Sequence, residues 1–579
     1  MRRNGTMGSL RWLALMMGTF VIAACGGGGS SSSPAPAAKT ISGVAAAGAP
    51  IIGSVTIKDS TTPTAQTKTV FIAADGKYTV DVSDLKAPYM VRADGYVGGN
   101  EYHLYSAATQ ADVGGTINIT PLTDLIVANI AGSIAKTYFD NDSFTGLTAA
   151  QLTAQSDALR AKLLPVLQAV GVSSSIDLLR ASFSTDHTGL DAALDILKVT
   201  TDTTTGVATI TNIITQQQMT SNVTTGTYTG VLDDTTGVAT GITDIQKISA
   251  GFKTFSALFA TSVPSETNPT LLSLFDSATF LMEGQNLASF LSEITTEQDI
   301  IGISFTNISI QSIDTTAGTA VVAFDVILNG MVANDGPKPF HMIKKTDGKW
   351  YMQGDQYIAH VKVESRAEFR PSDSTQQKNT GLNINIEDRG GKGITSAVVT
   401  GKGITNPVTL VNQINNNWFT IQTTNGNTGN MYFMNDTQIT AIADTGEVYT
   451  VQLYIGSTLT ATYTEKLRKR PYLNNELTAA SFPTITSPTM TEMRAFTGGN
   501  ATVTWTLPAG LTNDWLSMQM NDNSGNSARA EFSLAPADRS KSFTLNPITS
   551  TGQTFTPTGG GIWLGAWDSF GRQVATSMW

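Results

Sequence analysis

The spacing of apolar residues changes twice along the chain, and this limits the possible folds more than any other feature. Every second residue is apolar in short runs between Ile41 and Gly115, whereas spacings of three and four dominate from Thr120 onward. Alternation returns after Ile303 and recurs to the end of the chain. The sequence therefore predicts a multidomain, mainly β protein with an α-helical segment, an α+β cone and β-sandwiches at both ends.

Charged residues are scarce, at 14% of 579 residues, against roughly a quarter in ordinary soluble domains. Threonine, serine, asparagine and glutamine take their place, which favours exposed β-structure over long solvated helices. The net charge is −10, and because a nucleic-acid partner needs a basic face, we expect no nucleic acid to bind. Length alone gives roughly four domains at about 150 residues each, but the pattern along the chain favours five folded segments.

The only cysteine stands at the end of an N-terminal apolar stretch. The apolar run extends from Trp12 to Ala24 and is short for a membrane span. It is preceded by three positively charged residues, Arg2, Arg3 and Arg11. This is the layout of a secretory signal, which we assign to residues 1–24. A single cysteine excludes disulfides within the chain, zinc–cysteine clusters and a CxxC redox pair.

Residues 21–26, VIAACG, resemble the lipobox of bacterial lipoproteins. The resemblance implies cleavage before Cys25, a diacylglycerol on its thiol and acylation of its new amine. Two or more acyl chains anchor stably, so the implied partner is the membrane, and Gly26 in place of aspartate implies the outer membrane. An ordinary signal with a chance cysteine is the alternative. Residues 25–40 form a flexible Gly/Ser/Pro tether.

The first folded segment, residues 41–115, is expected to be a β-sandwich. Residues 54–58 and 78–82 alternate, and Asp75-Gly76 offers a hairpin turn between strands. Together with the run Ala87-Pro88-Tyr89, this pattern resembles the carboxypeptidase regulatory-like domain, which is an accessory module and not the peptidase. The alternative is that these residues form an Asp-Gly hairpin with a core tyrosine in a domain unrelated to that family.

Two segments with helical spacing follow. Residues 116–240 are predicted to begin with a helix that Thr120 caps, to continue through a helix that Pro165 kinks or divides, and to end in Thr-rich hairpins at 200–214 and 226–240. Residues 241–370 are expected to place a long helix against a curved antiparallel sheet, which we call the cone. Residues 340–352, FHMIKKTDGKWYM, resemble the last hairpin of the cystatin-like, nuclear-transport-factor-like superfamily, which implies that Trp350 is buried.

Two further β-sandwiches are predicted, at residues 371–480 and 481–579. The run TVTWTLP at 502–508 resembles the second strand of fibronectin type III-like sandwiches, which implies that Trp505 is a core residue. The basic run KLRKR at 466–470 is interpreted as a solvated linker, with a polyanion-binding patch as the alternative.

Motifs that carry chemistry are mostly missing. There is no HExxH, no Gly-x-Ser-x-Gly elbow and no P-loop. An acidic loop opens at Asp140, but Phe144, Thr145 and Gln151 stand where an EF-hand needs a ligand, a turn glycine and a bidentate glutamate. We therefore predict no catalytic residues, no metal and no cofactor.

The cone is the one place where a ligand pocket is expected. Its candidate residues are His341, Tyr351, Asp355 and His360. A His–Asp pair there could transfer a proton near neutral pH, and His341 and His360 are expected on adjacent strands. His341 stands between two apolar residues of the same strand, however, and neighbouring residues of a strand point to opposite sides. If the two apolar side chains fill the cone, the His341 side chain points away from it. A non-catalytic cone is therefore favoured.

The leading functional hypothesis is a lipid-anchored, non-catalytic binding or assembly protein at the outer membrane, with an unknown protein or glycan partner. One alternative is an enzyme that acts on a small hydrophobic ligand in the cone. Another is carbohydrate or cell-wall binding by the C-terminal sandwiches. Aromatic residues would carry that binding, although a core role is favoured for them: Trp515, Trp563 and Trp567.

Overall fold

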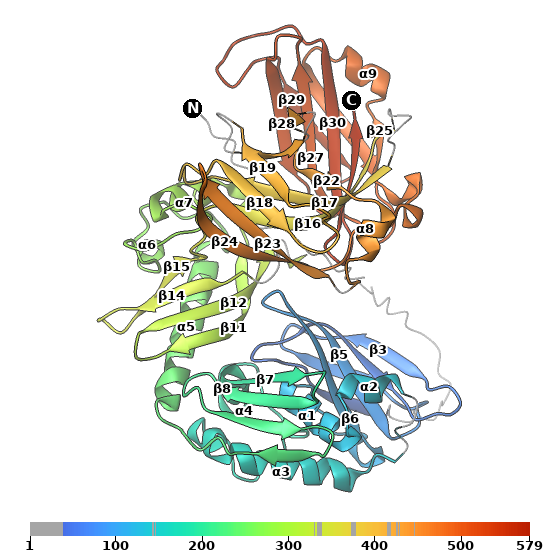
Figure 1. Ribbon diagram of the computed structural model, residues 1–579, viewed down its shortest axis with the longest axis vertical. Helices are drawn as coiled ribbons and strands as arrows, with labels where there is room; N and C mark the ends of the chain where they lie inside the picture. Colours follow the sequence, from blue (N-terminus) through green and yellow to red (C-terminus); the bar gives the residue numbers. More distant parts are fainter. Residues whose placement is uncertain are drawn as a thin grey trace, which may run out of the picture.

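The computed structural model describes residues 39–141, 144, 146–328, 331–332, 338–371, 378–413, 418–423, 426–427, 429–444 and 446–579. The predicted signal peptide, Cys25 and nearly all of the tether lie outside these residues, so lipidation stays a prediction. Within the described part the protein is mainly β and consists of several separate sheets, with its longer helices between residues 121 and 294, which confirms the predicted fold class (Figure 1).

The N-terminal sandwich encloses its own core, in which Ile41, Val55 and Tyr78 are buried. The Asp75-Gly76 turn forms, with Gly76 at φ 81°, but the predicted hairpin is wrong, because the strands before and after the turn, Thr67–Phe71 and Lys77–Asp81, pair in different sheets. One sheet pairs β1 with β4 and the other has the order β3-β2-β5-β6. The strands are β1 (Thr40–Val44), β2 (Ile52–Lys58), β3 (Thr67–Phe71), β4 (Lys77–Asp81), β5 (Tyr89–Val97) and β6 (Asn100–Ala108).

The helical segment begins where the sequence predicts. The Thr120 side chain accepts a hydrogen bond from Thr123 N, and Pro121 fills the first turn. The second long helix runs through Pro165 and is not divided there. The helices up to the cone are α1 (Pro121–Ala131), α2 (Ala135–Asp140), α3 (Ala149–Ala169), α4 (Gly189–Ile196), α5 (Val238–Leu258), α6 (Pro269–Leu272) and α7 (Leu287–Ile294).

Four short strands between α4 and α5 form one antiparallel meander, ordered β10-β9-β8-β7. They are β7 (Leu197–Asp202), β8 (Val207–Asn212), β9 (Gln218–Asn222) and β10 (Thr227–Thr229). The first predicted Thr-rich hairpin is present as β7 and β8. The second is wrong, because β10 pairs back onto β9 and residues from Val238 onward are helical.

The cone places α5 against the sheet β11-β12-β14-β15, with β13 paired to β12. Phe252 of α5 contacts the rings of Phe305, Phe324 and Phe340, and Trp350 is buried as predicted. One continuous core joins this unit to the preceding helices. The strands are β11 (Ser304–Asp314), β12 (Thr319–Leu328), β13 (Met331–Val332), β14 (Phe340–Lys344) and β15 (Trp350–Gly354).

The strand that follows β15 leaves the cone. β16 (His360–Phe369) pairs with β17 (Lys378–Glu387) and β31 (Gln573–Met578), not with the cone sheet. The expectation that His341 and His360 lie on adjacent strands is therefore wrong. The physical reason is that the apolar side chains of β16, such as Val361 and Val363, are buried against the neighbouring sandwich.

The C-terminal half is built around one sheet of seven strands, ordered β22-β17-β16-β31-β30-β27-β28. A sheet ordered β21-β20-β19-β18-β23-β24 and a sheet ordered β25-β26-β29 cover two parts of it, and each forms a core with it. Trp505 is 2% exposed in the second of these cores, which confirms its predicted position. The two C-terminal sandwiches thus share a sheet, joined by the parallel pair β16–β31.

The remaining elements complete these three sheets and their connections (Figure 1). They are β18 (Ser396–Thr400), β19 (Val408–Asn412), β20 (Phe419–Thr423), β21 (Gly426–Asn427), β22 (Met431–Phe433), α8 (Asp436–Thr440), β23 (Glu447–Ile455), β24 (Thr458–Leu467), β25 (Thr484–Ser487), α9 (Met490–Ala495), β26 (Gly499–Thr506), β27 (Thr512–Asn521), β28 (Ser527–Ser533), β29 (Ser540–Leu545) and β30 (Gly559–Trp567).

Candidate functional site

The four residues predicted for the cone pocket fall into two groups. Asp355 and His360 are buried beside Glu283, whereas the Tyr351 hydroxyl donates to Asp347 Oδ2 on the surface, 2.6 Å away. His341 lies partly buried on β14, and burial lowers its pKa. Among the described residues, no hydrogen bond or ion pair joins His341 or Tyr351 to the other two.

Glu283 is the centre of the buried group and is only 3% exposed. Its Oε1 lies 2.9 Å from His360 Nδ1 and 3.4 Å from Lys338 Nζ, and its Oε2 lies 2.6 Å from Arg389 Nη1. Burial opposes the ionisation of Glu283, but the adjacent His360, Arg389 and Lys338 outweigh it and hold its pKa well below the usual value. Glu283 is thus a carboxylate fixed by partners from the start of β16, from the residues just after β17 and from the residues just before β14.

Asp355 completes this group through its backbone contacts. Its Oδ1 accepts from the amides of Glu283 and Tyr357, each at 2.9 Å. Burial, followed by the nearby Glu283 charge, raises the pKa of Asp355 to about 7. The group ties the turn at Glu283 to the start of β16. The group therefore has a structural role, because it holds the cone against the C-terminal half.

Sequence reasoning found Asp355 and His360 but missed Glu283 and Arg389. Both stand in loops, and neither belongs to a motif. Glu283 has φ 50°, an uncommon backbone conformation for a residue other than glycine, and the sequence carries no signal for it.

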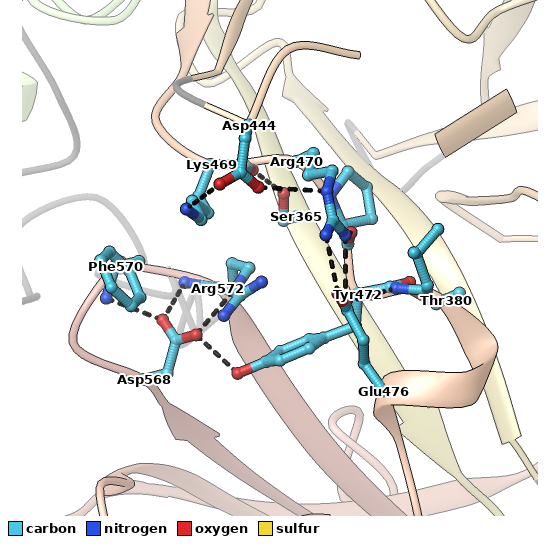
Figure 2. A network of polar contacts seen from close by, with 12 residues as sticks. Ser365, Thr380, Asp444, Lys469, Arg470, Tyr472, Glu476, Asp568, Phe570 and Arg572 are labelled. Carbon is cyan, nitrogen blue, oxygen red and sulfur yellow. Dashed lines mark hydrogen bonds and ion pairs between the residues drawn. The ribbon is translucent and has the colours of Figure 1, made fainter. Parts of the chain in front are cut away.

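The basic segment 466–470 is held in a network of polar contacts (Figure 2). Lys469 Nζ lies 2.7 Å from Asp444 Oδ2, and Arg470 pairs with both Asp444 and Glu476. Ser365 Oγ of β16 donates to Lys469 O at 2.5 Å. The interpretation as a solvated linker is therefore wrong, because the segment includes the end of β24 and is fixed to β16.

The same network reaches the turn between β30 and β31 (Figure 2). The Tyr472 hydroxyl donates to Asp568 Oδ2 at 2.6 Å, and Arg572 Nε lies 2.7 Å from the same oxygen. The Arg572 guanidinium is 3.6 Å from the centre of the Tyr472 ring. Thr380 Oγ1 of β17 donates to Tyr472 O at 2.8 Å. These contacts fix the junction at which the two C-terminal sandwiches share their sheet.

The shared sheet has one apolar and one polar face. Val363, Leu516 and Ile562 lie on the face that packs into the two C-terminal cores. Since neighbouring residues of a strand project to opposite faces, Glu364 and Trp563 lie on the other side. That side continues across β17, β16, β31, β30, β27 and β28.

The strand register shows which side chains this second side carries. Glu364 is opposite Asn383, and Arg366 is opposite Gln573. Trp563 is opposite Ser577 on β31 and Ser517 on β27. We call this surface the polar–aromatic face and define it by these residues: Asn383, Glu364, Arg366, Gln573, Ser577, Trp563, Ser517, Trp515 and Trp579.

Glycines of β30 let the tryptophan rings lie against the sheet. A Cβ on Gly565 would be 2.5 Å from Trp515 Nε1, and a Cβ on Gly561 would be 2.9 Å from the Trp563 ring. Both rings remain partly exposed. Trp579 is 53% exposed, and its own Cβ also lies over Gly561. The glycines thus make room for three aromatic side chains on one face.

Alternating charges of β16 run alongside these rings. Arg366 lies 2.8 Å from Glu368, and Arg370 lies 3.2 Å from the same carboxylate. The Arg366 guanidinium is 5.9 Å from the Trp515 ring centre, and that of Arg370 is 5.6 Å from the Trp579 ring centre. Both distances suit cation–π contact.

Several polar atoms of this face have no hydrogen-bond partner in the described part of the chain. They are Arg366 Nε, Asn383 Oδ1, Gln573 Oε1 and Ser577 Oγ. Trp567, the third tryptophan named from the sequence, is 4% exposed and donates to Asp514 Oδ2 at 2.6 Å. Burial raises the pKa of Asp514 well above its usual value. Trp567 is therefore buried, but it alternates in step with Trp563 along β30 and lies on the same side of the sheet, with Lys362 Nζ 5.2 Å from its ring centre. Trp515 and Trp563 lie partly exposed on the polar–aromatic face.

Comparisons with known proteins add no functional assignment. No protein-family model and no curated protein matches the chain, so the resemblances to carboxypeptidase regulatory-like and cystatin-like domains stay predictions. Among the residues that the structure describes, none of the helices is long and apolar enough to cross a membrane.

Three solved structures are similar to parts of the chain. One is a 1.5-MDa bacterial ice-binding adhesin, 13% identical, with 38% of this chain and 63% of that chain covered and a TM-score of 0.12. The chicken interferon gamma receptor alpha chain is 11% identical, with 38% and 96% covered and a TM-score of 0.12. The FN1–FN3 domains of chicken CNTN1 are 11% identical, with 47% and 97% covered and a TM-score of 0.13. TM-scores this low carry no argument about fold or function.

Proposed function

We propose that this protein is a non-catalytic binding protein of the bacterial cell envelope whose polar–aromatic face binds carbohydrate. The observation that carries the proposal is the arrangement of Trp515 over Gly565 and of Trp563 and Trp579 over Gly561. The glycines beneath the rings of Trp515 and Trp563 let these rings lie along the sheet instead of standing up from it. A flat, partly exposed ring matches the C–H face of a sugar, which is apolar.

The polar side chains beside the rings supply the second half of sugar recognition. A sugar presents many hydroxyl groups that both donate and accept, and the face offers guanidinium and amide donors with carboxylate and amide acceptors. Partners of these kinds surround the rings: Arg366, Glu368, Asn383 and Gln573.

The fibronectin type III-like character of residues 481–579 belongs to this proposal. The three-stranded sheet β25-β26-β29 faces the shared sheet over a common core. In this arrangement one side of the shared sheet is committed to packing, and the partly exposed rings of Trp515, Trp563 and Trp579 lie on its other side.

The test is binding of the purified chain to a glycan array, followed by titration of the strongest glycan. We expect Trp515→Ala to weaken that binding about tenfold or more, because a tryptophan anchor typically contributes more than about 1.4 kcal/mol. Phe71→Ala is the matched control, since Phe71 is 67% exposed on the N-terminal sandwich, far from the face in sequence. It should leave binding unchanged.

A blank array, or equal glycan affinity in the chain with and without Trp515→Ala, would overturn the proposal. Circular dichroism and the thermal midpoint of each variant check that the fold is retained. An unchanged midpoint is expected, because neither ring belongs to a buried core.

The envelope location rests on the lipobox-like sequence at Cys25. We expect Cys25→Ser to move the protein from the membrane fraction to the soluble fraction and to remove the mass of the lipid. The same lipid would hold the body at the membrane surface through its acyl chains. Ser30→Ala in the tether is the control and should change neither property. Unchanged partitioning and mass in the Cys25 variant would contradict the anchor.

A further inference from the structure

A histidine and two aspartates meet at the start of α4, away from the polar–aromatic face. Asp191 and Asp195 stand four residues apart on α4, which places them on one face of the helix, and His187 lies two residues before the helix begins. One possible ligand atom of each lies within 4.8 Å of the others. His187 Nδ1 is 2.9 Å from Asp195 Oδ2, and His187 N donates to Asp191 Oδ2 at 2.7 Å.

Both aspartates keep an oxygen without a partner. Asp191 is 1% exposed and Asp195 is 0% exposed, and the Oδ1 atom of each has no hydrogen-bond partner among the described residues. An orphaned carboxylate oxygen in the interior is costly unless something neutralises it. Because the orphans belong to two side chains that converge on one imidazole, they point to a shared cationic ligand.

The surroundings hold this group in place. His187 has φ 61°, so the backbone turns its side chain back over the helix that follows. Gln246 Nε2 of α5 donates to His187 O at 3.1 Å. On the other side Gly48 comes so close that a Cβ there would be 3.6 Å from Asp195 Oδ1. The group is therefore enclosed by the N-terminal sandwich, α4 and α5.

We propose that His187, Asp191 and Asp195 bind a divalent transition-metal ion of the Zn²⁺ class. Zn²⁺ binds imidazole nitrogens and carboxylate oxygens, and a site with three protein ligands leaves its fourth position for water. A single imidazole disfavours Ca²⁺ and Mg²⁺, which prefer sets made only of oxygen ligands. This site departs from the sequence-based expectation of no metal.

Charge balance favours the same conclusion. Two buried carboxylates carry up to two negative charges, and the imidazole supplies at most one positive charge. Lys198 lies near enough to interact with Asp195, and Lys253 with His187. A bound dication would neutralise both carboxylates directly.

The experiment uses the full chain carrying Cys25→Ser, so that no thiol competes for the metal. The chain is stripped with a chelator, dialysed against Zn²⁺ and then against buffer, and its metal content is measured by mass spectrometry. We expect about one zinc per chain. His187→Ala and Asp195→Asn should each lower the zinc content below about a tenth of an ion per chain, because each variant leaves only two of the three protein ligands.

His103→Ala is the matched control. His103 also lies near two carboxylates, at 2.7 Å from Asp94 Oδ1 and 3.3 Å from Glu101 Oε1, but it is half exposed and Arg92 already pairs with Asp94. Its removal should leave the zinc content unchanged. The proposal would be overturned if both site variants kept about one zinc per chain, or if only His103→Ala lost its zinc.

A second measurement does not depend on the variants' folding. The X-ray absorption spectrum of the zinc-loaded chain should show one imidazole and oxygen ligands, and Zn²⁺ should raise the thermal midpoint while Mg²⁺ does not. A chain that retains no zinc, that responds to Mg²⁺ alone, or whose zinc has two or more imidazoles would contradict the site.

Discussion

Replacing Glu283 with glutamine is expected to lower the free energy of unfolding by about 3–5 kcal/mol, the usual cost of removing one partner from a buried ionic group. Glutamine keeps the size of the side chain but removes the charge that faces His360, Lys338 and Arg389. The attraction that offset the burial of Lys338 and Arg389 then disappears. The loss should fall on the unfolding transition that separates the cone from the C-terminal half.

Urea unfolding followed by tryptophan fluorescence measures this change. The control is Glu447→Gln, because Glu447 pairs with Lys402, whose side chain is 65% exposed, and an exposed pair contributes about 0–1 kcal/mol. If Glu283→Gln costs no more than this control, the buried group does not hold the two parts together.

The contribution of Glu283 should also depend on pH in a defined direction. The pKa of Glu283 is held well below its ordinary value in the folded chain. Its stabilisation is therefore complete above the unfolded-state pKa of about 4.3 and is lost as the pH falls from there toward the folded-state value. The stability difference between the native chain and Glu283→Gln should shrink over that range. A difference that stays constant would contradict the role of the charge.

Trp505→Ala has the second large expected effect. Trp505 is 2% exposed in the last core, and its Nε1 donates to Asn513 Oδ1 at 2.8 Å. Removing the indole leaves a cavity and an unpartnered amide oxygen, and phenylalanine or tryptophan to alanine changes in cores cost about 3–5 kcal/mol. Asn513 also donates to Ala535 O and Asp538 O, each at 2.7 Å, so the loop between β28 and β29 should loosen as well.

Chemical denaturation of Trp505→Ala, followed by circular dichroism, gives the comparison. Phe71→Ala serves as the control, because Phe71 is 67% exposed and surface substitutions usually change stability by about 0.5 kcal/mol or less. A loss below about 1 kcal/mol for Trp505→Ala would mean that the last sandwich does not depend on this residue.

The local elements of this fold could be predicted because their signals are local. The turn at Gly76, the cap at Thr120 and the burial of Trp350 and Trp505 follow from neighbouring residues whose spacing repeats with the period of a helix or a strand. The spacing of His187, Asp191 and Asp195 was also visible, but no metal motif contains it. Their burial was the missing observation.

Tertiary structure alone decided which strands meet. The sequence by itself determined a mainly β chain with a helical segment. The alternating pattern of β16, however, fits a strand of the cone as well as a strand of the next sandwich. Its parallel pairing with β31 brings Arg366 beside Gln573 and thereby creates the polar–aromatic face. Glu283 and Arg389 are likewise far apart in the chain and meet only in the folded structure. Alternation specifies which side of a strand is buried, whereas the partner strand is chosen by the packing of residues far apart in the chain.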